Sequence, residues 1–208
     1  SEMCIRDSYR LKEIIEEGVY EMGKKDGLWT RSVIGFCGTR GPGEPEYPPL
    51  DGAKITEEFK NGQIHGKKIH WTSEGDKQFE ESYEKGTLHG LSTYWYQNGN
   101  KSSEKLFSTG TLKRITTWDY EGRKNHTNEH KLVNGLMALR MVHFYRSGQR
   151  KSESNFLDGK EHGAQLTWHE NGALKSESTF EKGEAKGMTK EFHENGQLWR
   201  KGEYKQGG

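Results

Sequence analysis

Histidines are the residues of this sequence whose spacing first suggests chemistry. Three of the nine occupy the same place in a Gly-x-x-His-Gly pattern: His65, His89 and His162. A zinc site needs several ligands at about 2 Å from one ion. If each pattern marks one hairpin, equivalent residues lie two strands apart, about 9.5 Å. We therefore predict exposed turn histidines, with no metal and no cofactor, and extend this to His169 and His193.

Glutamates recur just as regularly. Glu80, Glu104, Glu153 and Glu177 each follow a glycine by five residues. Catalytic carboxyl pairs need a defined separation and shifted pKa values, whereas this spacing supplies one glutamate per glycine. The pattern predicts a structural ladder with lysines such as Lys101 and Lys175 nearby, and it indicates that the protein is not an enzyme.

A glycine-rich stretch at 38–43 (GTRGPG) is only superficially similar to a phosphate-binding loop. No strand precedes it, no helix follows it, and no lysine stands at the P-loop position. All four prolines fall between residues 31 and 50, and proline cannot donate to a strand ladder. We predict an insertion loop at 31–50, and a partner-binding role for this loop is the alternative.

These residues recur because the chain repeats. Its glycines recur at a spacing of 24 residues, as in the pairs 62 and 86, 163 and 187, and 172 and 196. Such a period indicates a repeat architecture. Asn-Gly pairs at 98–99, 171–172 and 195–196 separate runs of alternating aromatic and polar residues, which predicts hairpins with two-residue type I′ turns. The predicted fold is all-β: an elongated array of seven antiparallel hairpins in a single-layer twisted sheet.

The register follows if each hairpin pairs symmetrically about its turn. A strand glycine then faces an aromatic ring, which compensates for the missing side chain. In the eroded hairpin centred on 121–122, Lys113 faces His130 instead, and we expect the segment 110–135 to be the most irregular. The predicted glycine–aromatic pairs are Gly66–Tyr83, Gly90–Phe107, Gly163–Phe180 and Gly187–Tyr204.

The N-terminal region is harder to place in the repeat. Residues 1–8 match no repeat position and are interpreted as a tail or a sequence-end artefact. Residues 9–18 fit either a short helix or half a repeat, in which Tyr20 closes a hairpin whose first strand is degenerate or missing, and we favour the half repeat. The repeat domain is thus predicted to span residues 9–208.

Two rows of large side chains follow from the register. The row of Trp71, Trp95 and Trp168, with Phe144 and Phe192, is interpreted as the packing surface of the sheet. Because a single layer cannot hide both faces, the other row should stay partly exposed, and exposed aromatic residues on a rigid scaffold are typical interface anchors. We predict that this row binds protein: Tyr94, Tyr96, His143, Tyr145, His169 and His193.

Composition narrows the functional classes. The chain has 32 basic and 31 acidic residues, so it lacks the basic field of a general nucleic-acid binder. Two cysteines do not make a disulfide framework or reveal the compartment, and no apolar run is long enough to span a membrane. The sequence starts at Ser1, so a missing leader is no guide to location, and a cytoplasmic location is slightly favoured.

Two stretches carry a family resemblance. Residues 83–107 (YEKGTLHGLSTYWYQNGNKSSEKLF) and 156–180 (FLDGKEHGAQLTWHENGALKSESTF) share an aromatic residue, Gly-x-x-x-Gly, Trp, Asn-Gly, Glu and a closing aromatic residue. They resemble MORN repeats, in particular the variant of bacterial proteins similar to the YwqK antitoxin. The resemblance implies an antiparallel hairpin sheet without catalytic residues. It also implies either binding to a toxin, as in the antitoxins, or membrane attachment and scaffolding, as in eukaryotic relatives.

Together these observations predict a non-enzymatic protein-binding module whose partner is a toxin. The alternative is a membrane-surface or scaffolding module, in which the basic pairs 24–25 and 67–68 would contact anionic lipid. Unpaired outer strands would also permit edge-to-edge self-association.

Overall fold

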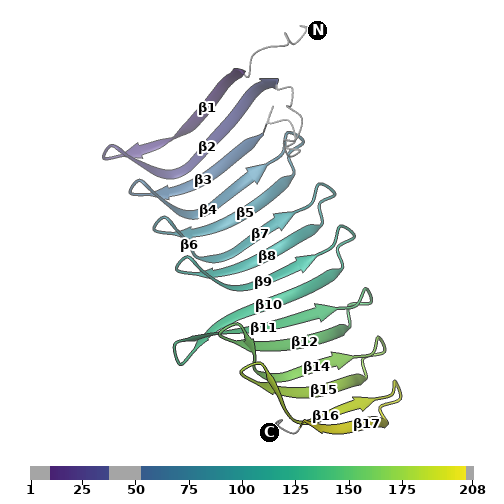
Figure 1. Cartoon of the computed structure of the whole chain (residues 1–208). Helices are drawn as coiled ribbons and strands as arrows, with labels where there is room; N and C mark the ends of the chain where they lie inside the picture. The colour runs from purple at the N-terminus through teal and green to yellow at the C-terminus, as the bar shows by residue number, and fades with distance from the viewer. Residues whose placement is uncertain (1–9, 38–52, 205–208) are drawn as a thin grey trace. The chain divides into compact units, whose positions relative to one another are not determined.

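The computed structural model describes residues 10–37 and 53–204. The described residues contain seventeen strands and no helix, and neighbouring strands run antiparallel (Figure 1). The predicted all-β hairpin array is therefore confirmed. No helix in the described part is long and apolar enough to cross a membrane. The strands are β1 (Arg10–Glu21), β2 (Lys24–Cys37), β3 (Lys54–Lys60), β4 (Gln63–Trp71), β5 (Lys77–Glu84), β6 (Thr87–Leu88), β7 (Gly90–Trp95), β8 (Lys101–Ser108), β9 (Thr111–Trp118), β10 (Lys124–Val133), β11 (Leu136–Phe144), β12 (Arg150–Leu157), β13 (Lys160–Glu161), β14 (Gly163–Trp168), β15 (Leu174–Glu181), β16 (Glu184–Phe192) and β17 (Leu198–Tyr204).

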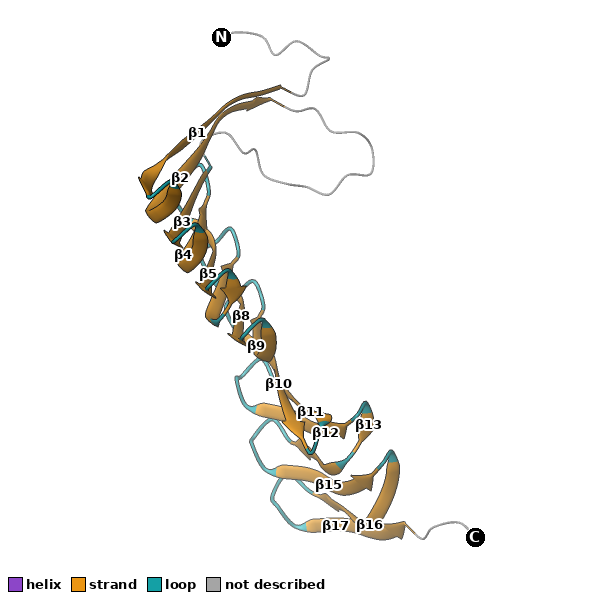
Figure 2. Ribbon diagram, turned by 90° about the vertical axis from the view of Figure 1, so that its left-hand side faces the viewer, coloured by secondary structure: helices purple, strands orange, loops and turns teal. Residues whose placement is uncertain are grey.

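The chain divides into two compact units. The first comprises residues 1–100 and 107–111, and the second comprises 101–106 and 112–208. In the first unit β1 to β5 pair in chain order, and β5 also pairs with β6 and β7. In the second unit β9 to β12 and β14 to β17 pair in the same way, with β12 next to β13 and β14. Each unit is therefore a single layer of strands (Figure 2).

One end of every hairpin turns through two left-handed residues. Lys85 and Gly86 have φ values of 49° and 78°, the signature of a type I′ turn, whose twist matches that of the flanking strands. The first glycine of each repeat occupies the second turn position. We call these seven turns the tips: 22–23, 61–62, 85–86, 109–110, 134–135, 158–159 and 182–183.

The three Asn-Gly pairs of the prediction, at 98–99, 171–172 and 195–196, lie at the opposite ends, and there the prediction of type I′ turns is wrong. Gly99 has φ 81°, but Asn98 is not among the residues with positive φ. The amide of Gly99 donates to Tyr96 O at 3.0 Å, and that of Tyr96 donates to Asn100 O at 2.8 Å. This is a three-residue loop, a type I turn followed by a left-handed glycine. Asn98 Oδ1 accepts the Asn100 amide at 3.0 Å, which favours a helical conformation for the asparagine.

The predicted register appears in the strand pairs despite the different turn. Gly66 pairs with Tyr83, Gly163 with Phe180 and Gly187 with Tyr204. Ring packing is not the reason for the glycine, however. A Cβ on Gly163 would meet only Asn155 Cβ, at 3.8 Å, whereas the φ of Gly163 is +89°. The left-handed backbone requires glycine at this position.

Hairpins that contain this second glycine of the repeat have a register shift next to the tip, which we call a kink. Between the pairs Glu57–Lys68 and Phe59–Ile64, β4 advances by four residues while β3 advances by two. The same two extra residues occur in β2 and β16. The β10–β11 hairpin, which lacks the second glycine, pairs without interruption from His126–His143 to Val133–Leu136. The segment expected to be the most irregular therefore contributes one strand to the most regular of these hairpins.

The N-terminal region is strand. Residues 10–21 form β1, so the helix is excluded there and the half repeat is correct from residue 10 onward. β2 continues to Cys37 and pairs with β1, so residues 31–37 of the predicted insertion loop are strand. The remaining loop residues 38–50, the glycine-rich stretch and the predicted tail at 1–8 lie outside the described residues.

The core is thin. Within the described part, the buried hydrophobic side chains are Trp29, Ala53 and Val142. Threonines are also buried, including Thr116 and Thr127, whose hydroxyl groups bond at 3.1 Å. Ordinary strand pairing and small polar contacts therefore supply much of the packing.

Candidate functional site

Strand pairing places Tyr94 and His143 on the face opposite the tryptophan row of their unit, whereas the other members of the predicted Tyr/His row lie in the loops that follow the strands. Partners in an antiparallel pair share a face, and successive residues alternate. His70 pairs with Phe79, and Phe79 pairs with Tyr94, on three neighbouring strands. We call the side of the first unit that carries these residues the tyrosine face. In the second unit, the tyrosine face is the side that carries His143, the residue equivalent to Tyr94. The opposite side is the tryptophan face, which carries Trp71, Trp95, Phe144, Trp168 and Phe192.

Cations cover the rings of the tryptophan face. Lys77 Nζ lies 5.3 Å from the centroid of the Trp71 ring and 6.0 Å from that of Trp95. In the second unit Lys124 Nζ lies 4.5 Å from the Phe144 ring. Cation–π contacts of this kind are stabilising, and they leave these rings less free to act as binding anchors.

The repeated glutamates form ion pairs on the same face. Glu80 contacts Lys77 at 2.7 Å and Lys67 at 2.9 Å, and hydrogen bonds from these lysines lower the pKa of Glu80. Arg140 bridges Glu129 and Glu153 at 3.1 and 2.7 Å, and its hydrogen bonds lower the pKa of Glu153. Lys101 and Lys190 pair with Glu104 and Glu177. These contacts agree with a structural ladder.

On the tyrosine face of the first unit, Tyr94 is fixed by a carboxylate. Its hydroxyl donates to Glu81 Oε1 at 2.6 Å, and the Tyr83 hydroxyl donates to Glu81 Oε2 at 2.8 Å. Burial, followed by the Glu81 hydrogen bond, raises the pKa of both tyrosines. Tyr96 lies beyond the strand in the Asn-Gly loop. Tyr94 therefore offers a ring edge, not a free hydroxyl.

In the second unit three predicted residues share one loop position, 24 residues apart. The Tyr145 hydroxyl donates to Trp168 O at 2.8 Å, and His169 Nε2 donates to Phe192 O at 2.8 Å. Each ring thus reaches the next hairpin and is held by it. His193 is exposed, with its ring centroid 6.1 Å from that of Trp199. We call Tyr145, His169 and His193 the loop edge.

His143 lies one residue before the end of β11 and two residues before Tyr145 of the loop edge. Its ring centroid is 5.7 Å from that of His126, its strand partner. His126 Nδ1 bonds the Thr117 hydroxyl at 2.8 Å. Burial and the neighbouring His143 lower the pKa of His126, so folding favours the neutral form of the His126 imidazole.

Two of the Gly-x-x-His-Gly histidines accept hydrogen bonds from backbone amides of the next tip, a role that the sequence did not reveal. His65 Nδ1 accepts the Lys85 amide at 3.4 Å, and His89 Nδ1 accepts the Thr109 amide at 3.3 Å. Asp26, at the equivalent position, accepts the Asn61 amide at 3.1 Å. Each side chain therefore ties its hairpin to the next tip. Within the described residues, no group of three or more His, Cys, Asp or Glu side chains is placed to hold a metal.

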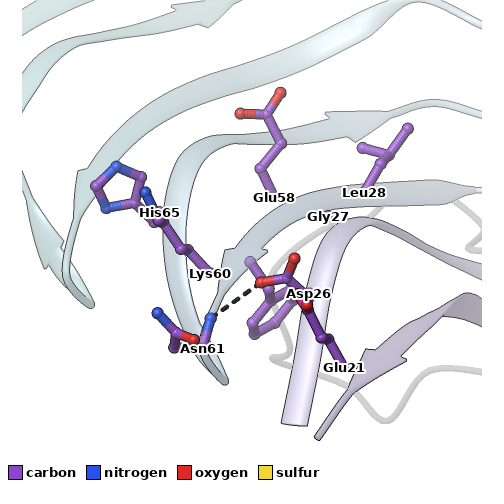
Figure 3. Close-up of a pocket in the computed structure, with 9 residues that line it drawn as sticks. Glu21, Asp26, Gly27, Leu28, Glu58, Lys60, Asn61 and His65 are labelled. Atoms are coloured by element: carbon purple, nitrogen blue, oxygen red, sulfur yellow. Dashed lines mark hydrogen bonds between the residues drawn. The ribbon is translucent and has the colours of Figure 1, made fainter.

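An open hollow of about 470 Å³ lies beside the first two tips (Figure 3). Figure 3 shows the hydrogen bond from the Asn61 amide to Asp26, which joins two of its lining residues. Glu58, on its wall, accepts the Lys67 amide at 2.9 Å. Its central carboxylates are thus engaged by backbone donors, and the hollow is best explained as space between kinked tips. The lining residues are Glu21, Asp26, Gly27, Leu28, Glu58, Phe59, Lys60, Asn61 and His65.

Comparison with known proteins identifies the repeat. The MORN repeat variant family model matches residues 88–109, 161–182 and 186–206. No curated protein matches the chain. The three matches support a MORN-repeat protein, in agreement with the hairpin array. MORN repeats are generally thought to mediate protein or membrane binding.

Proposed function

We propose that this chain is a non-enzymatic protein-binding module that uses the loop edge of its second unit. The observation that carries the proposal is the repeated tie between each loop ring and the next hairpin. Tyr145 and His169 both donate to backbone carbonyls 23 residues ahead. Their rings are therefore fixed before any partner arrives, so binding would lose little side-chain entropy.

The chemistry of these side chains supports a protein partner. Tyrosine and histidine combine an apolar ring with a polar tip, and tyrosine is enriched among the residues that dominate interface energies. His193 is the exposed member of the loop edge, so it is the residue on which binding should depend without a large structural cost. The proposed binding residues also include His143 in the second unit and, separately, Tyr94 and Tyr96 in the first.

We further propose that the partner is a toxin, neutralised when the repeat surface covers it. This proposal rests on the resemblance of residues 83–107 and 156–180 to the YwqK-type repeats. Neutralisation by coverage needs no catalytic group, which suits a sheet whose regularly spaced acids and bases are paired with one another.

Membrane attachment is the competing function, and the ion pairs weaken it. Lys68 contacts Glu57 at 3.0 Å, Lys67 contacts Glu80 at 2.9 Å, and Lys25 contacts Glu16 at 3.3 Å. Three of the four lysines invoked for lipid binding are thus already paired within the sheet. With a net charge of +1, little long-range attraction to anionic lipid remains.

The test begins with the full chain purified from its native host, followed by titration of the co-purified protein against variants. His193→Ala should weaken binding about tenfold or more. Glu184→Ala, an exposed change at the β15–β16 tip and thus at the opposite end of the hairpin from the loop edge, should leave affinity unchanged. Equal affinities for both variants would contradict the loop edge as the binding site.

A second pair of measurements separates the partner classes. Co-expression of this chain should relieve growth inhibition by a toxin partner, and His193→Ala should reduce that relief. If no protein co-purifies, but anionic vesicles bind the chain and release the Lys24/Lys25/Lys67/Lys68→Glu variant, membrane attachment replaces this proposal.

A further inference from the structure

The tip of the β10–β11 hairpin is hydrophobic and exposed. Leu132 is 61% exposed, Val133 39%, Leu136 43% and Met137 42%. These four residues flank the turn Asn134-Gly135, two on each side. Scattered exposed apolar side chains are ordinary, but a contiguous group at one point of a fold indicates an interaction site.

Other tips show that the repeat does not require these side chains. The residues directly beside the turn are Glu84 and Thr87 in one hairpin, and Glu181 and Glu184 in another. The corresponding pair in β10–β11 is Val133 and Leu136. Valine and leucine at this place therefore contribute something other than the formation of a tip.

The apolar side chains occupy both faces of the hairpin. Val133 pairs with Leu136, and Leu132 pairs with Met137. Because successive residues alternate between faces, one pair lies on the tryptophan face and the other on the tyrosine face. A flat partner surface would cover only one of these pairs, whereas a slot with two walls would cover both.

The polar residues at the outermost point of this tip favour insertion into a slot on a protein over insertion into a lipid bilayer. Asn134 and Gly135 form the outermost turn, so an amide side chain and turn peptide groups would enter first. In hydrocarbon such polar groups lose their hydrogen bonds to water at a cost of several kcal/mol. Arg140, farther back on β11, is held by Glu129 and Glu153, so it is engaged within the sheet and less available to lipid phosphates.

We propose that the β10–β11 tip is a docking wedge that enters a two-walled apolar slot on a protein partner. The floor of the slot supplies polar groups for Asn134, and its walls contact the Val133–Leu136 and Leu132–Met137 pairs. The inference rests on the proposed protein-binding function and assigns a second contact region to it. The pairing of β10 with β11 continues without interruption up to the wedge.

Photocrosslinking in the native host tests the wedge directly. A benzoylphenylalanine residue replaces Leu136 in the full chain, and the matched control replaces Glu184 at the equivalent place of the β15–β16 tip. A third chain carries the crosslinker at His193 in the loop edge. The expected result is a protein adduct at positions 136 and 193 but not at 184.

The crosslinked protein is then purified and titrated against Val133→Thr/Leu136→Thr, whose β-branched threonines retain strand propensity. Affinity should fall about 30-fold or more, since two apolar side chains lose their burial. Glu184→Thr should change it less than about twofold. Circular dichroism melts of both variants show that the fold is kept.

Three outcomes would overturn the wedge. An adduct at 193 alone, with unchanged affinity of the threonine variant, leaves the protein-binding function intact but removes the wedge. No protein adduct at any position removes both. Flotation with phosphatidylcholine vesicles, with or without phosphatidylserine, that is lost in Val133→Thr/Leu136→Thr would assign the tip to lipid instead.

Discussion

The β15–β16 and β10–β11 hairpins belong to the same unit and differ behind the tip. β16 advances four residues between Lys190 and Lys186 while β15 advances two, whereas β10 and β11 pair evenly. The repeat's second glycine is Gly187 in β16, and its equivalent in β11 is Leu139. At this repeat position, the kinked hairpin thus has a glycine and the straight hairpin has a leucine.

The position just before this residue changes as well. In the kinked hairpins of the first unit it holds Asp26, His65 or His89, each of which accepts an amide from the next tip. In β11 it holds Ala138. The kinked β15–β16 hairpin has Lys186 at this position, and Lys186 bonds Glu181 of its own hairpin, so the kink does not require the tie. In β10–β11 both are absent and the tip is apolar.

The largest expected effect comes from filling a second glycine. In Gly66→Val, a Cβ would lie 1.8 Å from Glu58 Oε2 and 2.9 Å from Glu58 Cβ, at a φ of +114°. Strain and displacement of Glu58 should together cost about 3 kcal/mol or more. Leu139→Val at the straight hairpin should cost only about 1 kcal/mol. Urea denaturation midpoints compare the two, and equal shifts would show that the glycine is not what sets the kinked geometry.

A smaller effect is expected when the straight hairpin receives the missing glycine. Leu139 is half-buried and pairs with Phe156, so Leu139→Gly loses side-chain packing and adds backbone entropy, about 2 kcal/mol in total. Amide hydrogen exchange should report faster opening of β10–β11, with little change in β15–β16. Slower exchange throughout β10–β11 would contradict the view that leucine stabilises the straight form.

The next largest effect is expected from removing the hydrogen bond that joins one hairpin to the next tip. His89→Ala removes the acceptor of the Thr109 amide and should cost about 1 kcal/mol. His162→Ala is its matched control, because His162 Nδ1 is buried without a hydrogen-bond partner. Thermal melts monitored by circular dichroism should shift for the first variant and hardly for the second; the reverse order would rule out the tie.

The smallest effect is a pH dependence of the straight hairpin. Folding lowers the pKa of His126 from its usual 6.5 through burial and His143. The unfolded chain therefore binds more protons just below pH 6.5, so stability is full above that pH and falls as acid is added. His126→Gln should flatten urea midpoints measured between pH 7.5 and 5.5. A midpoint that rises on acidification would refute the sign.

Much of this fold could be predicted from glycine spacing, since the 24-residue period and the pairing of Gly163 with Phe180 follow from sequence alone. The turn types could not. Asn-Gly suits both a type I′ turn, as at Asn61 and Asn134, and a type I turn followed by a left-handed glycine, as at Asn98, so the dipeptide alone does not distinguish them. Residues 31–37 were misplaced because a strand can extend past the repeat when β1 is long enough to pair with it.

The candidate site was less predictable than the fold. Tyr145 and His169 could be placed on one row, but their hydrogen bonds depend on carbonyls 23 residues ahead. His65 and His89 likewise act on a tip 20 residues away, which no local motif records. The apolar tip was visible as Leu-Val-Asn-Gly-Leu-Met, a signal that becomes meaningful only beside the polar tips of the other hairpins.

The left-handed turn residues also provide positions at which substitutions should raise the stability of the protein. Asparagine tolerates positive φ better than other side chains, yet only Asn61 and Asn134 use it among the seven tips. Each remaining tip is thus an independent place where one substitution should relieve strain without touching either face. Introducing asparagine one tip at a time should give a graded series of thermostable versions that differ at the tips but keep both sheet faces, useful as scaffolds for engineered binding. The five positions are Met22, Lys85, Thr109, Asp158 and Lys182.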